Sequence, residues 1–386
     1  MKQYHELLTA ILEHGHKKEA ARENMPGSIS LFGHQSRYDL SGGFPILTTK
    51  KVFWKGIVGE LLWMLSGNTN IKYLVDNGSN FWNEDAYNYY VKIASANGNA
   101  QQNPILKKLD DNSYKMFLFD EFVDIIKNSK IEDLPKWSQY TLGDCGHQYG
   151  KVWRRWSTNQ QVVIGHNGTH NEWGTVIIDQ IQNVIKSLKE SPESRRHIVT
   201  AVDPVNDKDL ALYWCHSMFQ FNCRKLTDSE RALYYYNNYG ETLLPLRTRD
   251  LDFLRIPKYK LDCQLYQRSA DVFLGYGFNM SSYSLLTLIL CKICNMVPGE
   301  FIHTAGDAHI YDNHLDAVNE QLSRDYNKYP LPTLKFSDNF NSSLLKYNQD
   351  NNFDVFINSL TPADFVLENY QSYPAIKAEL STGLIK

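Results

Sequence analysis

The central segment of the chain, LALYWCHSMFQ at 210–220, carries a Cys–His pair inside an apolar stretch. Cys215 could be a structural residue, because free cysteines are usually buried and inert. It could instead be a nucleophile, since a thiolate forms readily where a cationic neighbour or hydrogen-bond donors lower the pKa of the thiol. The positions of the cationic residues therefore decide between the two interpretations.

Three arginines stand beside serines at the ends of predicted strands. Arg195 and Arg196 follow Ser194 before one strand, and Arg268 with Ser269 ends another. Arginines in such places are commonly solvated surface charge. Arginines with adjacent hydroxyls can also bind a phosphate through paired hydrogen bonds, so an anionic ligand is the alternative interpretation.

Two short polar residues flank a glycine-containing segment directly after the second arginine cluster. Asp271 and Asn279 enclose VFLGYGF at 272–278. Glycine lets the backbone approach a ligand closely, so these two residues could bind the edge of a planar heterocycle. A turn that joins a strand to the next helix would explain the same glycines.

Glu60 is a single carboxylate beside the apolar run LLWML at 61–65. An acid in such surroundings is costly unless it is paired or takes part in chemistry. Glu60 is therefore expected either to be paired or to take part in chemistry.

The chain also contains two patterns that suggest metals. His309 and His314 are five residues apart beside aspartates, but one short stretch does not supply the three or four ligands that zinc requires. Cys291 and Cys294 form a CxxC pair inside an apolar helical run, where core packing is the better explanation. We predict no metal site.

Composition excludes several classes of protein. The 386 residues hold 40 Lys and Arg against 43 Asp and Glu, a net charge of −3, so no basic field for nucleic acid is expected. Six cysteines are too few for a disulfide framework and are expected to be reduced. The N-terminus is not a signal peptide, and no apolar run approaches the ~18 residues of a membrane span. We expect a cytoplasmic protein without membrane contact.

Apolar periodicity predicts helices and strands without a regular βαβ alternation, which favours an α+β fold. The predicted helices cover 4–12, 57–65, 176–188 and 281–297, and the predicted strands cover 197–202, 219–223 and 261–266. Residues 85–141, with a short helix at 115–127, and residues 225–258 have the composition of surface elaborations. We predict one catalytic domain over 1–386 that carries these two segments as insertions.

Nine ordered blocks of the sequence together resemble the thymidylate synthases and the related deoxypyrimidine hydroxymethylases. These blocks are MKQYHELL (1–8), SISLFGHQ (28–35), FPILTTKK (44–51), GELLWMLSGNTN (59–70), ESRRHIV (193–199), CHSMFQF (215–221), CQLYQRSADVFLG (263–275), FN (278–279) and GEFIHTAGDAHIYDNH (299–314). The resemblance implies an α+β fold with a large bent mixed β-sheet, flanking helices and a sheet face at a homodimer interface. It also implies dUMP as substrate and 5,10-methylenetetrahydrofolate as co-substrate.

The resemblance also implies roles for individual residues. The catalytic group is Cys215, Glu60, Tyr149, His216, Asp271 and Asn279. The substrate-binding group is Arg268, Ser269, Asp271, Asn279, His309 and Tyr311, with Arg195 and Arg196 reaching the partner's active site. The folate-binding group is Lys50, Trp82, Leu212, Asp271 and Phe278.

Elementary chemistry agrees with these roles. Addition of the Cys215 thiolate at C6 of a pyrimidine makes C5 nucleophilic, which divides one difficult step into easier ones. The amide of Asn279 can accept from N3–H and donate to O4 of uracil, whereas a carboxylate would suit cytosine. Asn279 therefore favours dUMP over dCMP.

The chain departs from the synthase pattern at four positions near the expected ligands. Glu23 stands where an arginine is expected, with Arg22 beside it; Trp214 and Gly277 replace prolines, and Asp85 replaces a tryptophan. Looser walls around the cofactor would let water complete the reaction. Our leading hypothesis from the sequence is therefore a dUMP hydroxymethylase of bacteriophage type, which forms 5-hydroxymethyl-dUMP and tetrahydrofolate. The alternatives are a thymidylate synthase and a catalytically silent nucleotide- or RNA-binding relative.

Overall fold

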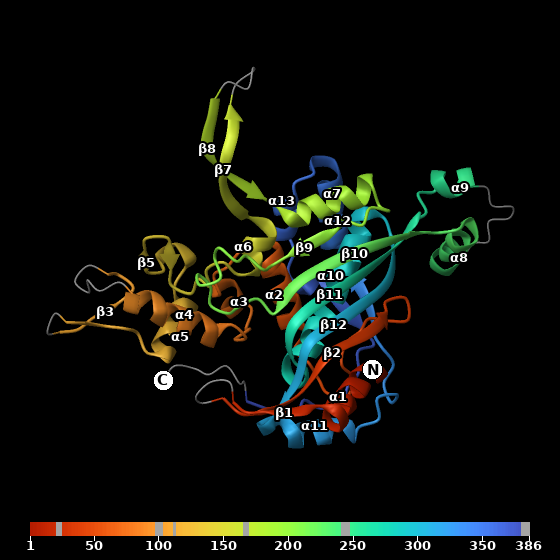
Figure 1. Ribbon diagram of the computed structural model, residues 1–386. Coiled ribbons are helices and arrows are strands. Elements are labelled where there is room, and N and C mark those ends of the chain that lie inside the picture. Colours follow the sequence, from red (N-terminus) through yellow and green to blue (C-terminus); the bar gives the residue numbers. More distant parts are fainter. Residues whose placement is uncertain (21–24, 97–102, 111–112, 165–169, 241–247, 380–386) are drawn as a thin grey trace.

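One mixed six-stranded sheet forms the centre of the molecule, with strand order β1-β2-β12-β11-β10-β9 (Figure 1). The computed structural model describes residues 1–20, 25–96, 103–110, 113–164, 170–240 and 248–379, with only the backbone of 159–164 and 170–173. β11 and β12 are parallel, and the other neighbours are antiparallel. The strands of this sheet are β1 (His16–Lys18), β2 (Ser28–Asp39), β9 (Ile198–Thr200), β10 (His216–Lys225), β11 (Tyr259–Asp271) and β12 (Val297–Tyr311).

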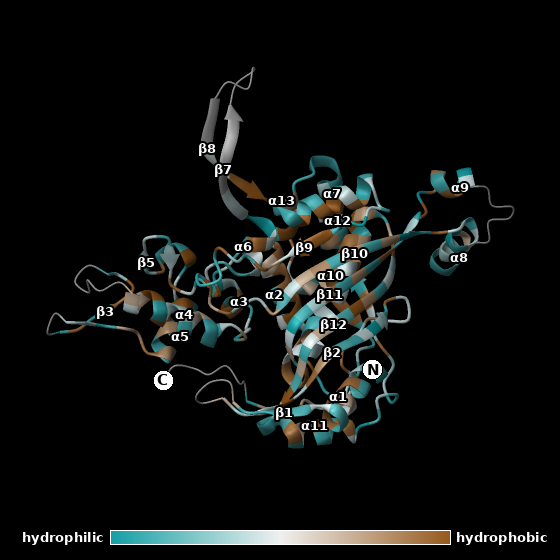
Figure 2. Cartoon of the chain, viewed as in Figure 1, coloured by the Kyte–Doolittle hydropathy of each residue, from teal (hydrophilic) through white to brown (hydrophobic). Residues whose placement is uncertain are grey.

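Helices cover one face of this sheet, so the predicted α+β class is confirmed. The buried helix α10 contacts β11, β12, α2 and α7, and α1 contacts β2 and β12. Hydrophobic residues concentrate in the sheet and in the helices behind it (Figure 2). The helices that flank the sheet are α1 (Lys2–His14), α2 (Trp54–Leu65), α6 (Tyr149–Arg154), α7 (Gln180–Glu190), α10 (Gly277–Cys294) and α11 (Leu315–Leu322).

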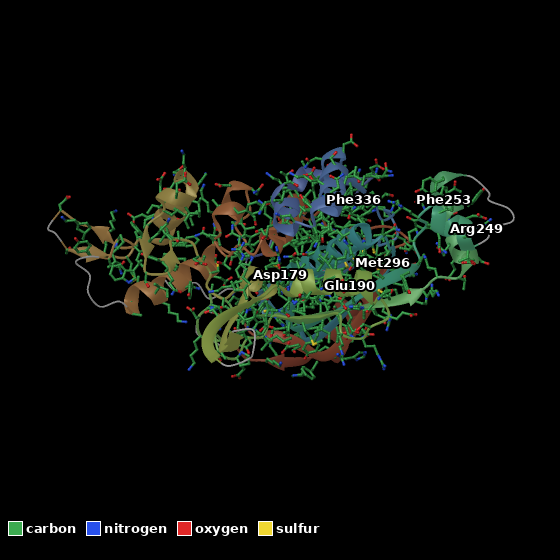
Figure 3. All side chains as sticks on the ribbon, turned by 90° about the horizontal axis from the view of Figure 1, so that it is seen from above. Asp179, Glu190, Arg249, Phe253, Met296 and Phe336 are labelled. Carbon is green, nitrogen blue, oxygen red and sulfur yellow. The ribbon has the colours of Figure 1, made fainter. Side chains whose placement is uncertain are left out.

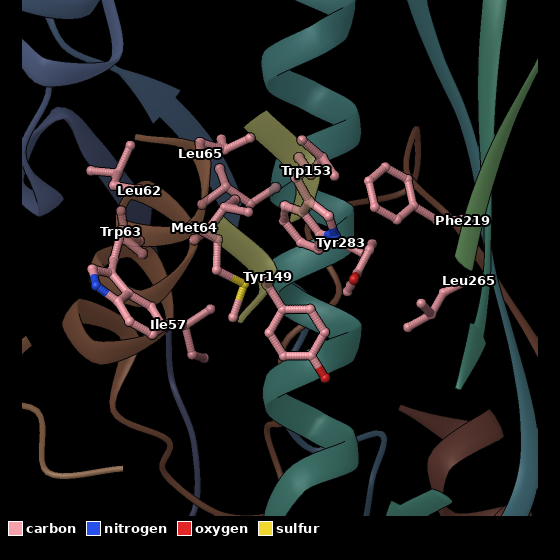
Figure 4. Close-up of a cluster of buried hydrophobic side chains, with 14 of the residues drawn as sticks. Ile57, Leu62, Trp63, Met64, Leu65, Tyr149, Trp153, Phe219, Leu265 and Tyr283 are labelled. Atoms are coloured by element: carbon pink, nitrogen blue, oxygen red, sulfur yellow. The ribbon is translucent and has the colours of Figure 1, made fainter. Parts of the chain in front are cut away.

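Aromatic side chains fill the core between the sheet and these helices (Figure 4). The Trp153 ring meets Phe219 edge-on at 5.2 Å between centroids, and Tyr283 of α10 lies 5.3 Å from Phe219. All three side chains are almost fully buried. Burial of such rings is the main stabilising contribution of a core of this kind.

The sequence misplaced the ends of α7 and α10. Residues 176–178 belong to a strand, and α7 begins only after Asp179, whose carboxylate accepts from Gln182 N. α10 begins earlier, at Gly277, and ends at Cys294, because Asn295 takes a left-handed conformation with φ of 51°. Caps and turns set these limits, and apolar periodicity does not register them.

The segment 85–141 contains more structure than the single predicted helix. Its aromatic residues form a cluster in which Tyr90 stacks on Phe122 at 5.3 Å, and both are fully buried. The predicted helix at 115–127 begins only at Phe119. The elements here are α3 (Lys72–Asp76) just before it, then α4 (Asn83–Ala96), β3 (Lys107–Lys108), β4 (Tyr114–Lys115), α5 (Phe119–Asn128), β5 (Lys136–Trp137) and β6 (Tyr140–Thr141).

The segment 225–258 forms an arm of two helices, α8 (Asp228–Tyr239) and α9 (Thr248–Phe253). The arm projects from one end of β10 and β11, and Figure 3 shows Arg249 and Phe253 far from Asp179 and Glu190 of α7. Its base is held by Arg231, which is buried and bonds to Asp252 Oδ1 at 2.7 Å.

Two further parts complete the fold. A hairpin projects from the body before α7 (Figure 1). It consists of β7 (Trp156–Ile164) and β8 (His170–Ile178). The C-terminal part consists of β13 (Thr333–Phe336), α12 (Asp338–Asp350), α13 (Phe353–Asn358) and β14 (Phe365–Glu368).

Arg154 joins the C-terminal helices to the core. Its side chain is 2% exposed, pairs with Asp179 at 2.9 Å and Asp354 at 2.7 Å, and also donates to the carbonyl of Leu65. We expect Arg154→Met to lower the free energy of unfolding by about 3 kcal/mol or more, because it leaves the buried carbonyl of Leu65 and the mostly buried carboxylate of Asp179 unpaired. Urea denaturation would measure this loss.

The control is Arg224→Met, which removes a pair with Glu230 at 2.8 Å whose side chains are 51% and 39% exposed. Solvent screens this pair, so the expected loss is much smaller than that of Arg154→Met. Equal losses in the two variants would contradict a structural role for the Arg154 network.

Candidate active site

The backbone of Cys215 is fixed at the start of β10. The Tyr149 hydroxyl of α6 accepts from the N–H groups of Cys215 at 2.8 Å and His216 at 3.1 Å. The carbonyl of Cys215 accepts from the N–H of Arg268 at 2.8 Å. A register shift between His216 and Met218 interrupts the pairing of β10 with β11 at this point. Such irregularities re-aim side chains at strand ends, and here the Cys215 side chain stays partly accessible.

Arg268 lies against this cysteine. Its Nη2 is 3.6 Å from Cys215 Sγ, and it donates to the carbonyls of Tyr213 and Trp214 at 2.9 Å each. Burial raises the pKa of the Cys215 thiol, the positive charge of Arg268 opposes this rise, and the charge of Asp85 adds to it. The structure therefore places beside this thiol a cation that favours its ionisation.

Asn279 of α10 belongs to a buried polar network. Its Nδ2 donates to Gln267 Oε1 at 3.1 Å, and the same oxygen is 2.8 Å from His303 Nε2. Burial lowers the pKa of His216 to about 4, against a hydrogen bond with Asn279, so His216 is neutral at pH 7. With one amide hydrogen on Gln267 and its oxygen in the hydrogen bond with His216, Asn279 keeps its other amide hydrogen and the second lone pair of its oxygen for a ligand.

The sequence analysis missed Gln267 in this network. Side chains alternate between the faces of a strand, so Gln267, Ser269 and Asp271 share one face of β11. That spacing could have indicated Gln267 as a neighbour of the site.

Glu60 is connected to Tyr149 through the side chain of Trp82. Trp82 Nε1 donates to Glu60 Oε1 at 2.6 Å, and the Trp82 ring meets the Tyr149 ring edge-on at 6.2 Å. Burial raises the pKa of Glu60 to about 7, and the hydrogen bond from Trp82 opposes this rise. A carboxyl with this pKa can both donate and accept a proton near neutral pH.

His309 and Tyr311 of β12 lie together, with ring centroids 4.9 Å apart. His309 Nδ1 is 3.2 Å from Asp307 Oδ1, and Asp307 is the register partner of Ser269 in β11. Burial alone would raise the pKa of Asp307, but hydrogen bonds from His309, Lys18 and Ser30 lower it. When a neutral His309 donates its Nδ1–H as a hydrogen bond to this carboxylate, its Nε2 is an acceptor for a hydroxyl.

The predicted folate residues divide into two sets. Phe278 packs edge-on against Phe81 at 5.2 Å. Together with Trp82 these rings offer the apolar faces that a planar cofactor needs. Lys50 is directed into the protein, because it is 4% exposed and donates to the carbonyl of Phe273.

Lys50, Asp271 and Leu212 of the predicted folate-binding group interact with other parts of the protein. Burial lowers the pKa of Lys50 to about 7, against the charge of Asp271. Asp271 Oδ1 accepts from Leu274 N at 3.0 Å, and the carbonyl of Leu212 accepts from Gln148 Nε2. The buried Gln148 Oε1 has no hydrogen-bond partner among the described residues.

The remaining predicted residues are not brought to Cys215 in this single chain. Arg195 and Arg196 are exposed and lie just before β9. Gln220 Nε2 donates a hydrogen bond to the carbonyl of Arg195. Arg22 and Glu23 lie outside the described residues.

Within the described ranges, no group of three or more His, Cys, Asp and Glu residues could hold a metal ion. One stretch, Val272–Cys294, is long and apolar enough to cross a membrane, but it is 72% buried in the core. This stretch contains α10, which overlaps the helix predicted at 281–297.

The fold places a partly accessible cysteine beside an arginine, and the same chain buries the carboxyl of Glu60 with a raised pKa, which are groups that nucleophilic and acid–base catalysis use. A family model described as thymidylate synthase matches residues 2–382. The chain belongs to the thymidylate synthase family, whose members are transferases that use methylenetetrahydrofolate as co-substrate.

Curated relatives match over almost the full length. The chain is 39% identical to a thymidylate synthase of Staphylococcus haemolyticus over 98% of this chain and 97% of that protein. It is 38% identical to those of Listeria monocytogenes and Listeria innocua over 99% of this chain and 100% of each relative. These relatives carry the synthase name and give no support to the hydroxymethylase of bacteriophage type, so they favour the alternative of reductive methylation.

Proposed function

We propose that this protein is a thymidylate synthase, which converts dUMP and methylenetetrahydrofolate to dTMP and dihydrofolate. The observation that carries the proposal is the contact of Arg268 Nη2 with Cys215 Sγ at 3.6 Å. This contact places an arginine, a residue that can bind phosphate, beside the proposed nucleophile. The name shared by the relatives supports methylation as the outcome.

Two departures that suggested a hydroxymethylase have other physical explanations. Trp214 is fully buried, and its Nε1 donates to the carbonyl of His147 at 2.9 Å. At Gly277 a Cβ atom would lie 2.4 Å from Leu47 Cδ1, so glycine is present because the wall is close. Both positions are packed against other parts of the protein, which supports methylation over hydroxymethylation.

In the proposed reaction each residue has a distinct task. The Cys215 thiolate adds to C6 of the pyrimidine, and Asn279 holds N3–H and O4. Glu60 exchanges protons near O4 and C5 because its pKa is about 7. Bound methylenetetrahydrofolate supplies the one-carbon unit and the hydride.

Further parts of the proposal concern the nucleotide and the assembly. We propose that Arg268 and Ser269 bind the phosphate and that His309 and Tyr311 bind the ribose 3′-hydroxyl. We also propose a homodimer in which Arg195 and Arg196 reach the partner's active site, and a single catalytic domain with 85–141 and 225–258 as insertions.

Product analysis tests the reaction. Incubation with dUMP and methylenetetrahydrofolate is expected to give dihydrofolate, detected by its absorbance, together with a nucleotide that is heavier by one methylene group. A 5-hydroxymethyl nucleotide without dihydrofolate would establish the hydroxymethylase instead. Absence of any turnover, with dUMP still bound, would indicate the catalytically silent relative.

The Asn279→Asp variant tests the reading of the base. We expect its preference for dUMP over dCMP, as a ratio of kcat/KM, to fall by about 10²-fold or more, because a carboxyl suits the amino group of cytosine and loses the donor to O4. The control is Asn238→Asp on the distant helix α8, which should keep the wild-type ratio. An unchanged ratio in Asn279→Asp would contradict base recognition by this residue.

A further inference from the structure

Tyr213 lies two residues before the nucleophile, and no role described above uses its ring. The ring is 42% exposed, and the guanidinium carbon of Arg268 lies 5.0 Å from the ring centre. Arg268 Nη2 donates to the carbonyl of Tyr213 at 2.9 Å, and Cys215 Sγ is 3.7 Å from the same oxygen. One residue thus contacts both the cation and the thiol.

We propose that Tyr213 is a positioning residue whose aromatic face holds the Arg268 guanidinium beside Cys215 Sγ. An arginine side chain has many rotamers, and an aromatic face attracts its guanidinium by a cation–π interaction. The carbonyl at 213 is present with any residue, so the ring is the part that the side chain contributes. This inference concerns the site of the proposed function and names the residue that maintains its electrostatics.

The backbone around Tyr213 is well anchored, so its ring has a defined place. The adjacent Trp214 is fully buried, and its ring centroid lies 5.3 Å from that of Tyr213. Two carbonyls of this segment accept from Arg268, at Nε and Nη2. Loss of the ring should therefore leave the guanidinium held by these carbonyls alone, and so less firmly, without unfolding the segment.

The charge balance at Cys215 makes the position of Arg268 consequential. Arg268 of β11 favours the thiolate, and Asp85 of α4 opposes it. Tyr149 of α6 faces the same region with a raised pKa, and the adjacent His216 is neutral at pH 7, so neither adds positive charge. A guanidinium that moves away from Sγ leaves burial and Asp85 to act without this compensation.

The test is the pH profile of Cys215 alkylation by iodoacetamide, followed by mass analysis of the peptide that contains Cys215. We expect Tyr213→Leu to raise the apparent pKa of this cysteine by about 0.5 or more and to slow its alkylation at pH 7 about threefold or more. Tyr213→Phe keeps the aromatic face and should stay within about twofold of the wild type.

A distant control separates this effect from a general one. Tyr236→Leu replaces a tyrosine of similar exposure, 52%, on α8 and should leave the profile unchanged. A wild-type profile for Tyr213→Leu, or an equal change in Tyr213→Phe, would overturn the proposal. Since alkylation needs no turnover, a failure of the proposed reaction would appear separately, as wild-type protein that alkylates normally but forms no product from dUMP.

Discussion

A Cys215→Ser variant will lose turnover of dUMP by at least about 10⁴-fold. A serine hydroxyl is too weak a nucleophile near neutral pH to form the covalent adduct at C6. The substitution removes little volume, and the backbone of residue 215 is held by Tyr149 and Arg268 independently of the side chain. The fold and the affinity for dUMP should therefore be retained. Steady-state kinetics and calorimetric binding of dUMP would measure the two quantities.

The matched control is Cys294→Ser. Cys294 is also partly accessible, but its Sγ lies at the end of α10 near the carbonyl of Ile185. We expect its kcat to stay within about twofold of the wild type, since it does not contact the site. Residual activity of Cys215→Ser above one per cent would reject covalent catalysis by this residue.

A Glu60→Gln variant will lower kcat by about 10²- to 10⁴-fold, because the amide cannot exchange protons. Gln is close in size to Glu and can still accept the hydrogen bond from Trp82. The control is Glu132→Gln, since Glu132 is exposed in the segment 85–141, and its kcat should be unchanged. A loss confined to KM would contradict a role for Glu60 in proton transfer.

The same variant should change how stability depends on pH. Burial raises the pKa of Glu60 from 4.5 to about 7 in the folded chain. Between these values the unfolded chain ionises this carboxyl while the folded chain keeps it protonated, so its stabilising contribution is complete below pH 4.5 and is lost as pH rises to about 7.

Glu60→Gln lacks this loss. The free energy of unfolding of the variant, relative to the wild type, should therefore rise by about 3 kcal/mol between pH 4 and pH 8. Urea denaturation at both values measures it. A constant difference across this range would mean that Glu60 ionises at its ordinary pKa.

The sequence predicted the fold class and the middle of α1, α2, α7, α10, β9, β10 and β11, because apolar periodicity reports which residues face a core. It did not predict the long central strands β2 and β12. It did not predict the hairpin β7–β8 or the start of α7, where the exposed Ile177 and Ile178 continue an apolar pattern into a strand. Asp179 then caps the helix. These limits depend on capping and on neighbours that periodicity does not contain.

The departures at Trp214 and Gly277 show how a local reading can mislead. By type, each suggested a looser pocket than proline would give. In the structure Trp214 is buried and hydrogen-bonded. A Cβ atom added at Gly277 would lie 2.4 Å from Leu47 Cδ1. Whether a substitution opens or closes a wall depends on what packs against it, and residue type alone does not state this.

The sequence by itself indicated the family, because nine blocks resemble it in order along the chain, and it named Cys215, Glu60 and Asn279 as candidate reactive groups. Only the tertiary structure decided how these groups act on one another. Arg268 is 53 residues from Cys215 along the chain yet 3.6 Å from its sulfur. The pairing of β10 with β11 makes that contact, and burial by distant segments sets the pKa of Glu60, so both properties arise only when the chain is folded.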